Sequence, residues 1–147
     1  MMIFTVKGAP QGKARARTVR NKYTGKVHSF TPEKTASYEE LIRWSYKSAG
    51  GEYYADKMLE ISIIAYFPVP QSYSKKKHSE ANCGDIRPTK KPDCDNIIKI
   101  VLDALNGVAY HDDKQVVCVS CNKYYAETGC VVIEINELKT KGEEHND

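Results

Sequence analysis

The sequence predicts a single two-layer α+β domain, in which a mostly antiparallel mixed sheet carries two main helices on one face. Its 147 residues are 41% hydrophobic, which is enough for one core and too little for two. Segments with strand-like and helix-like patterns of apolar residues follow one another without an internal repeat. We therefore assign residues 1–138 to one domain and residues 139–147 to a polar C-terminal tail.

The first half of the chain is expected to hold a strand, a basic loop and a helix. Residues 2–8 alternate enough to form the opening strand, and residues 9–30 are typical of a Gly- and Arg-rich loop that ends in a short returning strand. Thr31 is the expected N-cap of the helix, with Pro32 at its first helical position and the end near residues 49–51. The buried stripe of this helix should consist of Tyr38, Leu41, Ile42 and Tyr46.

The second half should contain a long strand, a second helix and two closing strands. Residues 57–69 form the strand, and a polar connection over residues 70–92 leads to the helix at residues 95–107. Residues 115–126 and 129–135 are expected to close the domain as a hairpin. The core-facing residues of the long strand and the helix should be Leu59, Ile61, Ile63, Ala65, Phe67, Ile97, Ile98, Val101, Leu102 and Leu105.

The net charge of +3 hides an asymmetry along the chain. The first 32 residues carry seven Lys and Arg and no acid, whereas the remainder sums to 15 − 19 = −4. Such a run can be a solvated loop, or it can contact nucleic acid. The basic residues at which we expect DNA contact are Lys13, Arg15, Arg17, Arg20, Lys75, Lys76, Lys77, Arg87, Lys90 and Lys91.

The cysteine pattern favours a reducing compartment, and we expect the cytoplasm. Five cysteines form an odd set without the dense spacing of a secreted disulfide scaffold. Cys118 and Cys121 form a CxxC, but they lie in a predicted strand, and no second metal-binding pair follows. No apolar run approaches the length of about 18–20 residues that a bilayer crossing needs, so we expect no membrane partner.

Four carboxylates lie at the two ends of the second predicted helix. Asp93 and Asp95 precede its apolar residues, and Asp112 and Asp113 follow its end. Helix capping and a turn before a strand would account for each pair separately. The alternative is that an antiparallel strand over residues 115–126, beside the long strand, brings the two pairs together.

Clustered carboxylates raise one another's pKa and are best neutralised by a hard divalent cation. Mg²⁺, or Mn²⁺ in its place, takes carboxylate oxygens and substrate phosphates, and it can activate water for phosphodiester hydrolysis. Lys99 lies one helical turn beyond Asp95 and could hold the scissile phosphate. Acids for a metal between two basic segments therefore predict a metal-dependent nuclease, without a small-molecule cofactor.

Four stretches of the chain also resemble the RusA-type Holliday-junction resolvases, a family of phage and prophage endodeoxyribonucleases. They are GKARAR, FTPEKTxxYEE, RPTKKPDxDNxxK and DALNGVAYxDDxQV. The resemblance spans nearly the whole chain, and the third stretch is its most specific part. Cys94 stands where members of the family often have Leu, and the Arg-rich loop differs in detail.

The resemblance implies Mg²⁺-dependent paired cleavage of four-way DNA junctions by a homodimer, in DNA recombination and repair. The carboxylate positions of the family fall on Asp93, Asp95 and Asp113, and its essential lysine falls on Lys99. Further matching positions, with less defined roles, are Asn96, Asp103, Asp112 and Gln115.

Two alternatives belong to other functional classes. A catalytically inactive DNA-binding or recombination-accessory module would show salt-dependent binding but no product with Mg²⁺. A metal phosphoesterase acting on smaller nucleic-acid substrates would hydrolyse mononucleotides in preference to junctions. Tyr23, in the first basic loop, is a further candidate for stacking on DNA.

Overall fold

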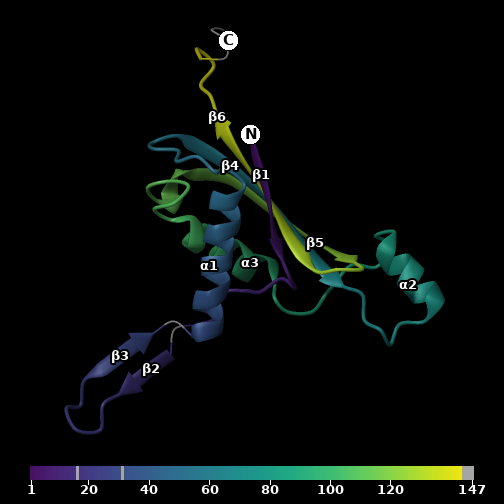
Figure 1. Ribbon diagram of the computed structural model, residues 1–147, viewed down its shortest axis with the longest axis horizontal. Helices are drawn as coiled ribbons and strands as arrows, with labels where there is room; N and C mark the ends of the chain where they lie inside the picture. Colours follow the sequence, from purple (N-terminus) through teal and green to yellow (C-terminus); the bar gives the residue numbers. More distant parts are fainter. Residues whose placement is uncertain (16, 31, 144–147) are drawn as a thin grey trace.

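The computed structural model describes residues 1–15, 17–30 and 32–143 as an α+β domain, which confirms the predicted class. Its main sheet is mixed and mostly antiparallel, with the strand order β1-β6-β4-β5 (Figure 1). The bounds of these strands are Met2–Lys7 for β1, Cys130–Leu138 for β6, Met58–Pro68 for β4 and Val116–Ala126 for β5. A separate ribbon pairs β2 (Arg17–Arg20) with β3 (Val27–Phe30).

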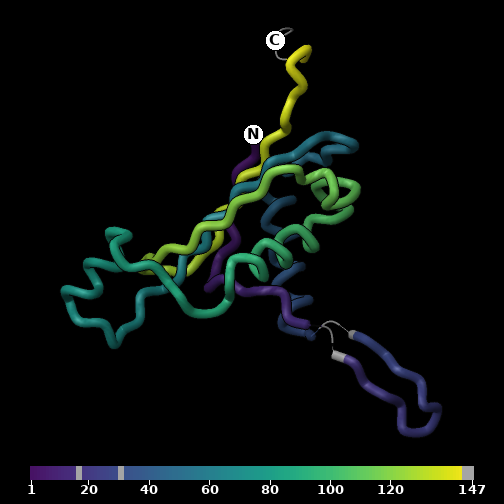
Figure 2. The backbone as a smooth tube through the Cα atoms, turned by 180° about the vertical axis from the view of Figure 1, so that it is seen from behind, coloured from purple at the N-terminus to yellow at the C-terminus, as the bar shows by residue number. Residues whose placement is uncertain are grey.

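The main helices are α1 (Glu33–Ser48) and α3 (Cys94–Leu105), and both cover the same face of the sheet (Figures 1 and 2). The strand registers explain this arrangement. Phe4 on β1 and Cys121 on β5 lie in one row across the sheet, so their side chains point to one face. The ring of Phe4 meets Tyr46 of α1, and the Cys121 carbonyl accepts from Cys94 of α3. The five alternate residues predicted for β4 are all buried between these helices and the sheet.

The two closing strands do not form the expected hairpin. β4 lies between them, because β5 pairs with it in parallel and β6 pairs with it antiparallel. The expected antiparallel pairing of residues 115–126 with the long strand is therefore wrong. The turn after β5 crosses the end of β4 at Pro68, where an added Cβ on Gly129 would lie 2.9 Å from Ala9 and 3.2 Å from Pro68. Pro68 lacks a backbone N–H, so no ladder hydrogen bond is lost where the chain crosses.

The first helix agrees with its predicted core stripe. Tyr38, Ile42 and Tyr46 are buried, and Leu41 is half-buried. The helix begins at Glu33, so Pro32 occupies the N-cap rather than the first helical position, and the expected cap Thr31 lies outside the described residues. It ends just before the predicted glycines.

The second predicted helix is rotated relative to the expected core stripe. Ile97, Val101 and Leu105 are buried as predicted, but Ile98 and Leu102 are only half-buried. Their places are taken by Ile100 and Ala104. The helix packs against α1 as well as against β5, so its buried arc shifts toward the side between them. The spacing of apolar residues in the sequence does not show that α3 packs against two elements, α1 and β5.

The connection predicted over residues 70–92 contains a helix, α2 (Lys75–Asn82). Ser74 caps it by accepting a hydrogen bond from the Lys77 N–H at 3.2 Å. Only Ala81 of this helix is buried, so it lacks the apolar stripe by which a helix is recognised in a sequence. Within the described part of the chain, the helices are too short or too polar to span a bilayer.

Candidate active site at the two ends of one helix

The first carboxylate pair lies at the start of α3. Asp93 is the N-cap residue, and Asp95 belongs to the first turn, where unpaired backbone N–H groups favour negative charge. The Asn96 side chain donates to Asp93 Oδ1 at 2.6 Å. Loss of hydration raises the pKa of Asp93, but the hydrogen bonds that its carboxylate accepts from the Asn96 side chain and the nearby backbone outweigh it, so this pKa lies below its ordinary value. Both carboxylates are exposed and available to a ligand.

The second pair lies at a short 3-10 helix, η1 (Asp113–Gln115), which precedes β5. Asp112 caps it by accepting from the Lys114 N–H at 2.9 Å. The Gln115 side chain accepts from the backbone N–H groups of His111 and Asp112, and it donates to the Tyr54 carbonyl at 2.7 Å. These contacts give Asp112 and Gln115 a structural role, which is to fix the turn that presents Asp113.

Asp113 is half-buried and differs electrostatically from the other acids. Loss of hydration and the neighbouring Asp112 carboxylate raise its pKa, with a smaller contribution from Asp103. Asp103 lies two residues before the end of α3, and α3 is in contact with η1, which begins at Asp113. The buried Tyr110 closes this end of the helix, with its hydroxyl donating to the Leu102 carbonyl at 2.7 Å.

The structure thus holds the four carboxylates as two pairs, one at each end of α3. At about 1.5 Å per residue, Asp103 lies about 12 Å beyond Asp95 along the helix axis. Lys99 is exposed between them on the same polar face. The residues that the structure describes contain no group of three His, Cys, Asp or Glu side chains placed to hold a metal ion. A meeting of Asp113 with Asp93 and Asp95 around one ion stays a prediction.

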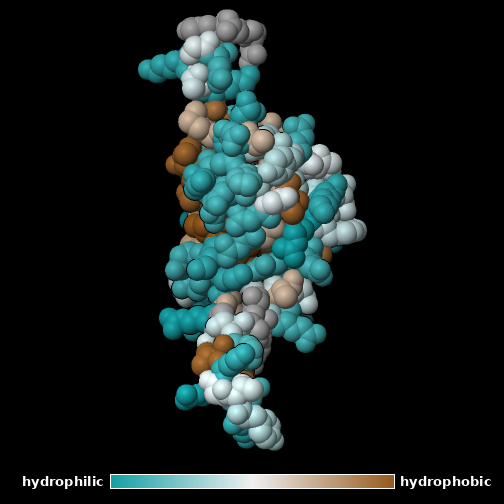
Figure 3. All heavy atoms as spheres, turned by 90° about the vertical axis from the view of Figure 1, so that its left-hand side faces the viewer, coloured by the Kyte–Doolittle hydropathy of each residue, from teal (hydrophilic) through white to brown (hydrophobic). Residues whose placement is uncertain are grey.

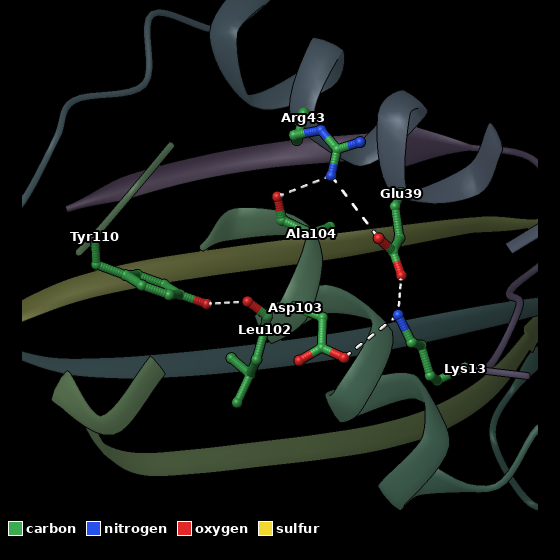
Figure 4. Close-up of polar contacts among 7 residues, drawn as sticks. All are labelled: Lys13, Glu39, Arg43, Leu102, Asp103, Ala104 and Tyr110. Carbon is green, nitrogen blue, oxygen red and sulfur yellow. Dashed lines mark hydrogen bonds and ion pairs between the residues drawn. The ribbon is translucent and has the colours of Figure 1, made fainter. Parts of the chain in front are cut away.

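Lys13 connects the polar face of α3 to α1 (Figure 4). Its Nζ forms ion pairs with Glu39 and, at 3.5 Å, with Asp103, and Arg43 lies 3.8 Å from the other oxygen of Glu39. Partial burial alone would lower the pKa of Lys13, but Glu39 and Asp103 raise it above the ordinary value. Lys13, which the sequence predicted to bind DNA, is therefore engaged in ion pairs within the protein, and one of these pairs holds the Asp103 side chain.

A cleft of about 580 Å³ opens beside the first carboxylate pair. Asp93 and Asn96 line one side, and the basic residues Arg15, Lys34 and Lys91 lie around it. The segment before Arg15 is held against α3, since the Lys13 N–H donates to the Asn96 carbonyl at 3.1 Å. The cleft therefore places cations next to the acids at the start of α3, as the binding of a phosphate backbone requires.

The second basic segment is fastened along the edge of β5. Arg87 Nε donates to the Lys123 carbonyl at 2.8 Å, and its guanidinium lies 4.1 Å from the centre of the Tyr124 ring. Lys123 in turn donates to the Lys90 carbonyl at 2.6 Å. These contacts hold the chain just before Asp93 in a defined position along β5.

The three consecutive lysines of this segment form the first turn of α2. Lys75 and Lys76 are exposed, and Lys77 lies 4.2 Å from the centre of the Tyr73 ring. The helix is tied to the turn after β5 by Glu127, which accepts from Asn82 at 2.8 Å and contacts His78 at 2.6 Å. α2 is therefore a basic element attached at the far end of the sheet from η1.

Comparison with known proteins identifies the family. The family model described as "Endodeoxyribonuclease RusA" matches residues 7–136. The chain belongs to the RusA endodeoxyribonuclease family. It is also 38% identical over 138 residues to a Bacillus subtilis (strain 168) protein described as "Uncharacterized protein YqaN", with 92% of this chain and 95% of that protein covered.

Two further basic residues lie beside those predicted from the sequence. Lys34, in the first turn of α1, reaches the cleft beside Asp93. Lys123 lies near the end of β5, beside Lys90. Lys123 stands in no quoted motif or charge run. Lys34 belongs to the FTPEKTxxYEE stretch, but only the structure shows that it lines the cleft beside Asp93.

Proposed function

We propose that the protein is a divalent-metal-dependent endodeoxyribonuclease that cuts four-way DNA junctions, with Mg²⁺ as its ion. One observation carries the proposal. The carboxylates of Asp93 and Asp95 stand together at the start of α3, beside a cleft with basic residues around it, in a chain of the RusA endodeoxyribonuclease family. Carboxylates alone would repel DNA, whereas carboxylates within a basic surface suit an ion that bridges protein and phosphate.

The donor set fits Mg²⁺. This ion takes one or two carboxylates, keeps several waters and completes its shell with substrate phosphate oxygens. Asp93 and Asp95 are adjacent and exposed, and the low pKa of Asp93 keeps its carboxylate ionised. When bound, the ion would supply an activated water and stabilise the leaving oxygen. We propose Asp113 as a further carboxylate needed for cutting, and Lys99 as the cation that holds the scissile phosphate.

The basic residues near the acids would position the DNA backbone. In the proposal, Arg15, Lys34 and Lys91 contact phosphates on the cleft side, and Arg87 and Lys90 do so along β5. A second copy of the chain would supply a second, equivalent site, because a symmetric junction is resolved cleanly by two matched cuts. The homodimer and a role in recombination and repair are parts of this proposal.

The test compares a labelled four-way junction with a linear duplex of the same length, each incubated with Mg²⁺ or with EDTA. Wild-type protein should cut the junction only with Mg²⁺ and leave the duplex intact. Asp93→Asn and Asp113→Asn should reduce junction cutting by at least about 100-fold, while junction binding in EDTA survives. Asp85→Asn is the matched control, because Asp85 is an exposed aspartate outside both pairs.

Three results would contradict the proposal. If Asp113→Asn cut at the wild-type rate, Asp113 would not belong to the active site. If the protein cut the junction and the linear duplex equally well, it would not be selective for junctions. Binding without any product in Mg²⁺ or Mn²⁺ would instead identify a DNA-binding module that does not cleave.

A further inference from the structure

The β-arm, which we define as β2, β3 and the turn over residues 21–26, stands apart from the domain. Its strands pair with each other and form a sheet separate from the main one. Both backbone views show it projecting away from the helices (Figures 1 and 2). Val19 and Val27 are 50% and 60% exposed on it. Since an isolated two-stranded hairpin gains little from its own packing, the β-arm points to a partner outside the chain.

The tip of the β-arm is an ordered turn that presents one aromatic ring. The Asn21 side chain accepts from the N–H groups of Tyr23 at 2.8 Å and Thr24 at 3.1 Å. The Asn21 N–H donates to the Lys26 carbonyl at 2.8 Å, and Gly25 supplies the positive φ of 68° that the turn requires. The backbone of Tyr23 is thereby fixed, while its side chain is 97% exposed.

The charge of the β-arm decides which kind of partner fits. It carries four Lys and Arg and no acid, and its surface in Figure 3 mixes hydrophilic, intermediate and hydrophobic residues. A second copy of this chain offers a net charge of only −4 over its residues 33–147. Duplex DNA carries about one negative charge per 1.7 Å of its axis, and its major groove admits a two-stranded β-ribbon. DNA is therefore the better complement.

We propose that the β-arm enters the branch point of the DNA and that Tyr23 stacks on a base there, so that this residue discriminates branched from linear DNA. This inference rests on the proposed function. At a branch point, the continuous stacking of base pairs is interrupted, and a base face becomes available to an aromatic ring. A linear duplex offers no such face in its interior. The cations of the β-arm strengthen binding to both branched and linear DNA, whereas the Tyr23 ring strengthens binding only at a branch point.

The experiment measures dissociation constants in EDTA, so that binding is separated from cutting. Four-way junction and linear duplex are compared at one salt concentration for the wild type, Tyr23→Ala and Tyr23→Phe. Tyr23→Ala should weaken junction binding about 5- to 100-fold and leave duplex binding unchanged. Tyr23→Phe keeps the ring and should bind like the wild type. Tyr53→Ala is the matched control, because Tyr53 is also more than half exposed, but outside the β-arm.

The results that would contradict the role of Tyr23 differ from those that would contradict the proposed function. Equal junction binding by Tyr23→Ala and the wild type, or equal weakening on junction and duplex, would overturn the role of the ring. A drop in mass by light scattering on Tyr23→Ala would overturn it too, by identifying the β-arm as a subunit contact. Failure of the wild type to cut a junction with Mg²⁺ would instead overturn the proposed function, whatever the dissociation constants show.

Discussion

Gly12 is the position at which a single methyl group should disturb the candidate site most directly. A Cβ added there would lie 2.9 Å from the Cβ atoms of both Asn96 and Pro92. Those two atoms are fixed to the backbone and cannot rotate away. Gly12→Ala therefore forces the N-terminal segment away from the start of α3, and it strains the hydrogen bond from the Lys13 N–H to the Asn96 carbonyl.

The expected loss follows from three contributions. Overpacking of a close contact costs about 1–3 kcal/mol. Weakening one backbone hydrogen bond adds up to about 1 kcal/mol. Alanine also lowers the conformational entropy of the unfolded chain, which stabilises the folded state by about 0.4–1 kcal/mol and offsets part of this loss. We expect a net loss of about 1–3 kcal/mol, and each kcal/mol should lower the Tm of a domain of this size by about 2–4 °C.

Activity should fall further than stability does. Gly12 lines the cleft where it packs against Pro92 and Asn96, so the same displacement moves the neighbouring Arg15 side of the cleft relative to Asp93. A misplacement of about 1 Å can cost about 100-fold in rate. Cutting of a four-way junction with Mg²⁺, at a temperature where the variant is folded, should therefore slow by about 10- to 100-fold.

The matched control is Gly142→Ala, because an added Cβ at Gly142 meets nothing within 4 Å. Thermal denaturation and single-turnover cutting should show wild-type behaviour for this control. If Gly12→Ala were as stable as the control and cut at the same rate, the close contact between the N-terminal segment and α3 would be refuted.

Three further predictions concern contacts around the site. Lys13→Met leaves the largely shielded Glu39 without its lysine partner and should cost about 1–3 kcal/mol in urea denaturation; an unchanged midpoint would contradict this. Tyr110→Phe removes one buried hydrogen bond and should cost about 0.5–1.5 kcal/mol, so a stabilised variant would be contrary. The hydrogen bond with His78 lowers the pKa of Glu127 below 4.5, so its contribution is present above that pH and is lost on further acidification. The protection factors of α2 amides, which correct for the intrinsic pH dependence of exchange, should therefore fall at acid pH in the wild type, and Glu127→Gln should abolish that fall.

The pairing of the last two strands shows where sequence patterns stop being informative. Residues 115–126 and 130–138 both carry strand patterns, and the short turn between them favours a hairpin. The structure instead places β4 between them. The hydrophobic pattern specifies which face of each strand is buried, but it does not specify which neighbour the strand takes, since the same faces are buried in either order.

The candidate site divides in the same way. Asp93, Asp95 and Lys99 could be proposed from residue types and spacing, and the family resemblance favoured Asp113 over Asp112. The engagement of Lys13 with Glu39 and Asp103, the presence of Lys34 beside Asp93 and the contact of Lys123 with the Lys90 carbonyl could not. These residues lie far apart along the chain, and no local pattern connects them.

By itself, the sequence determined the α+β class, the buried face of β4, the core stripe of α1 and the basic and acidic segments, because each depends on residues within one or two turns of one another. Only the tertiary structure decided the parallel pairing of β5, the rotation of α3 and the engagement of Lys13 with Glu39 and Asp103. These features depend on which elements compete for the same apolar surface. That competition is settled by packing across the whole domain, where segments distant in the chain meet.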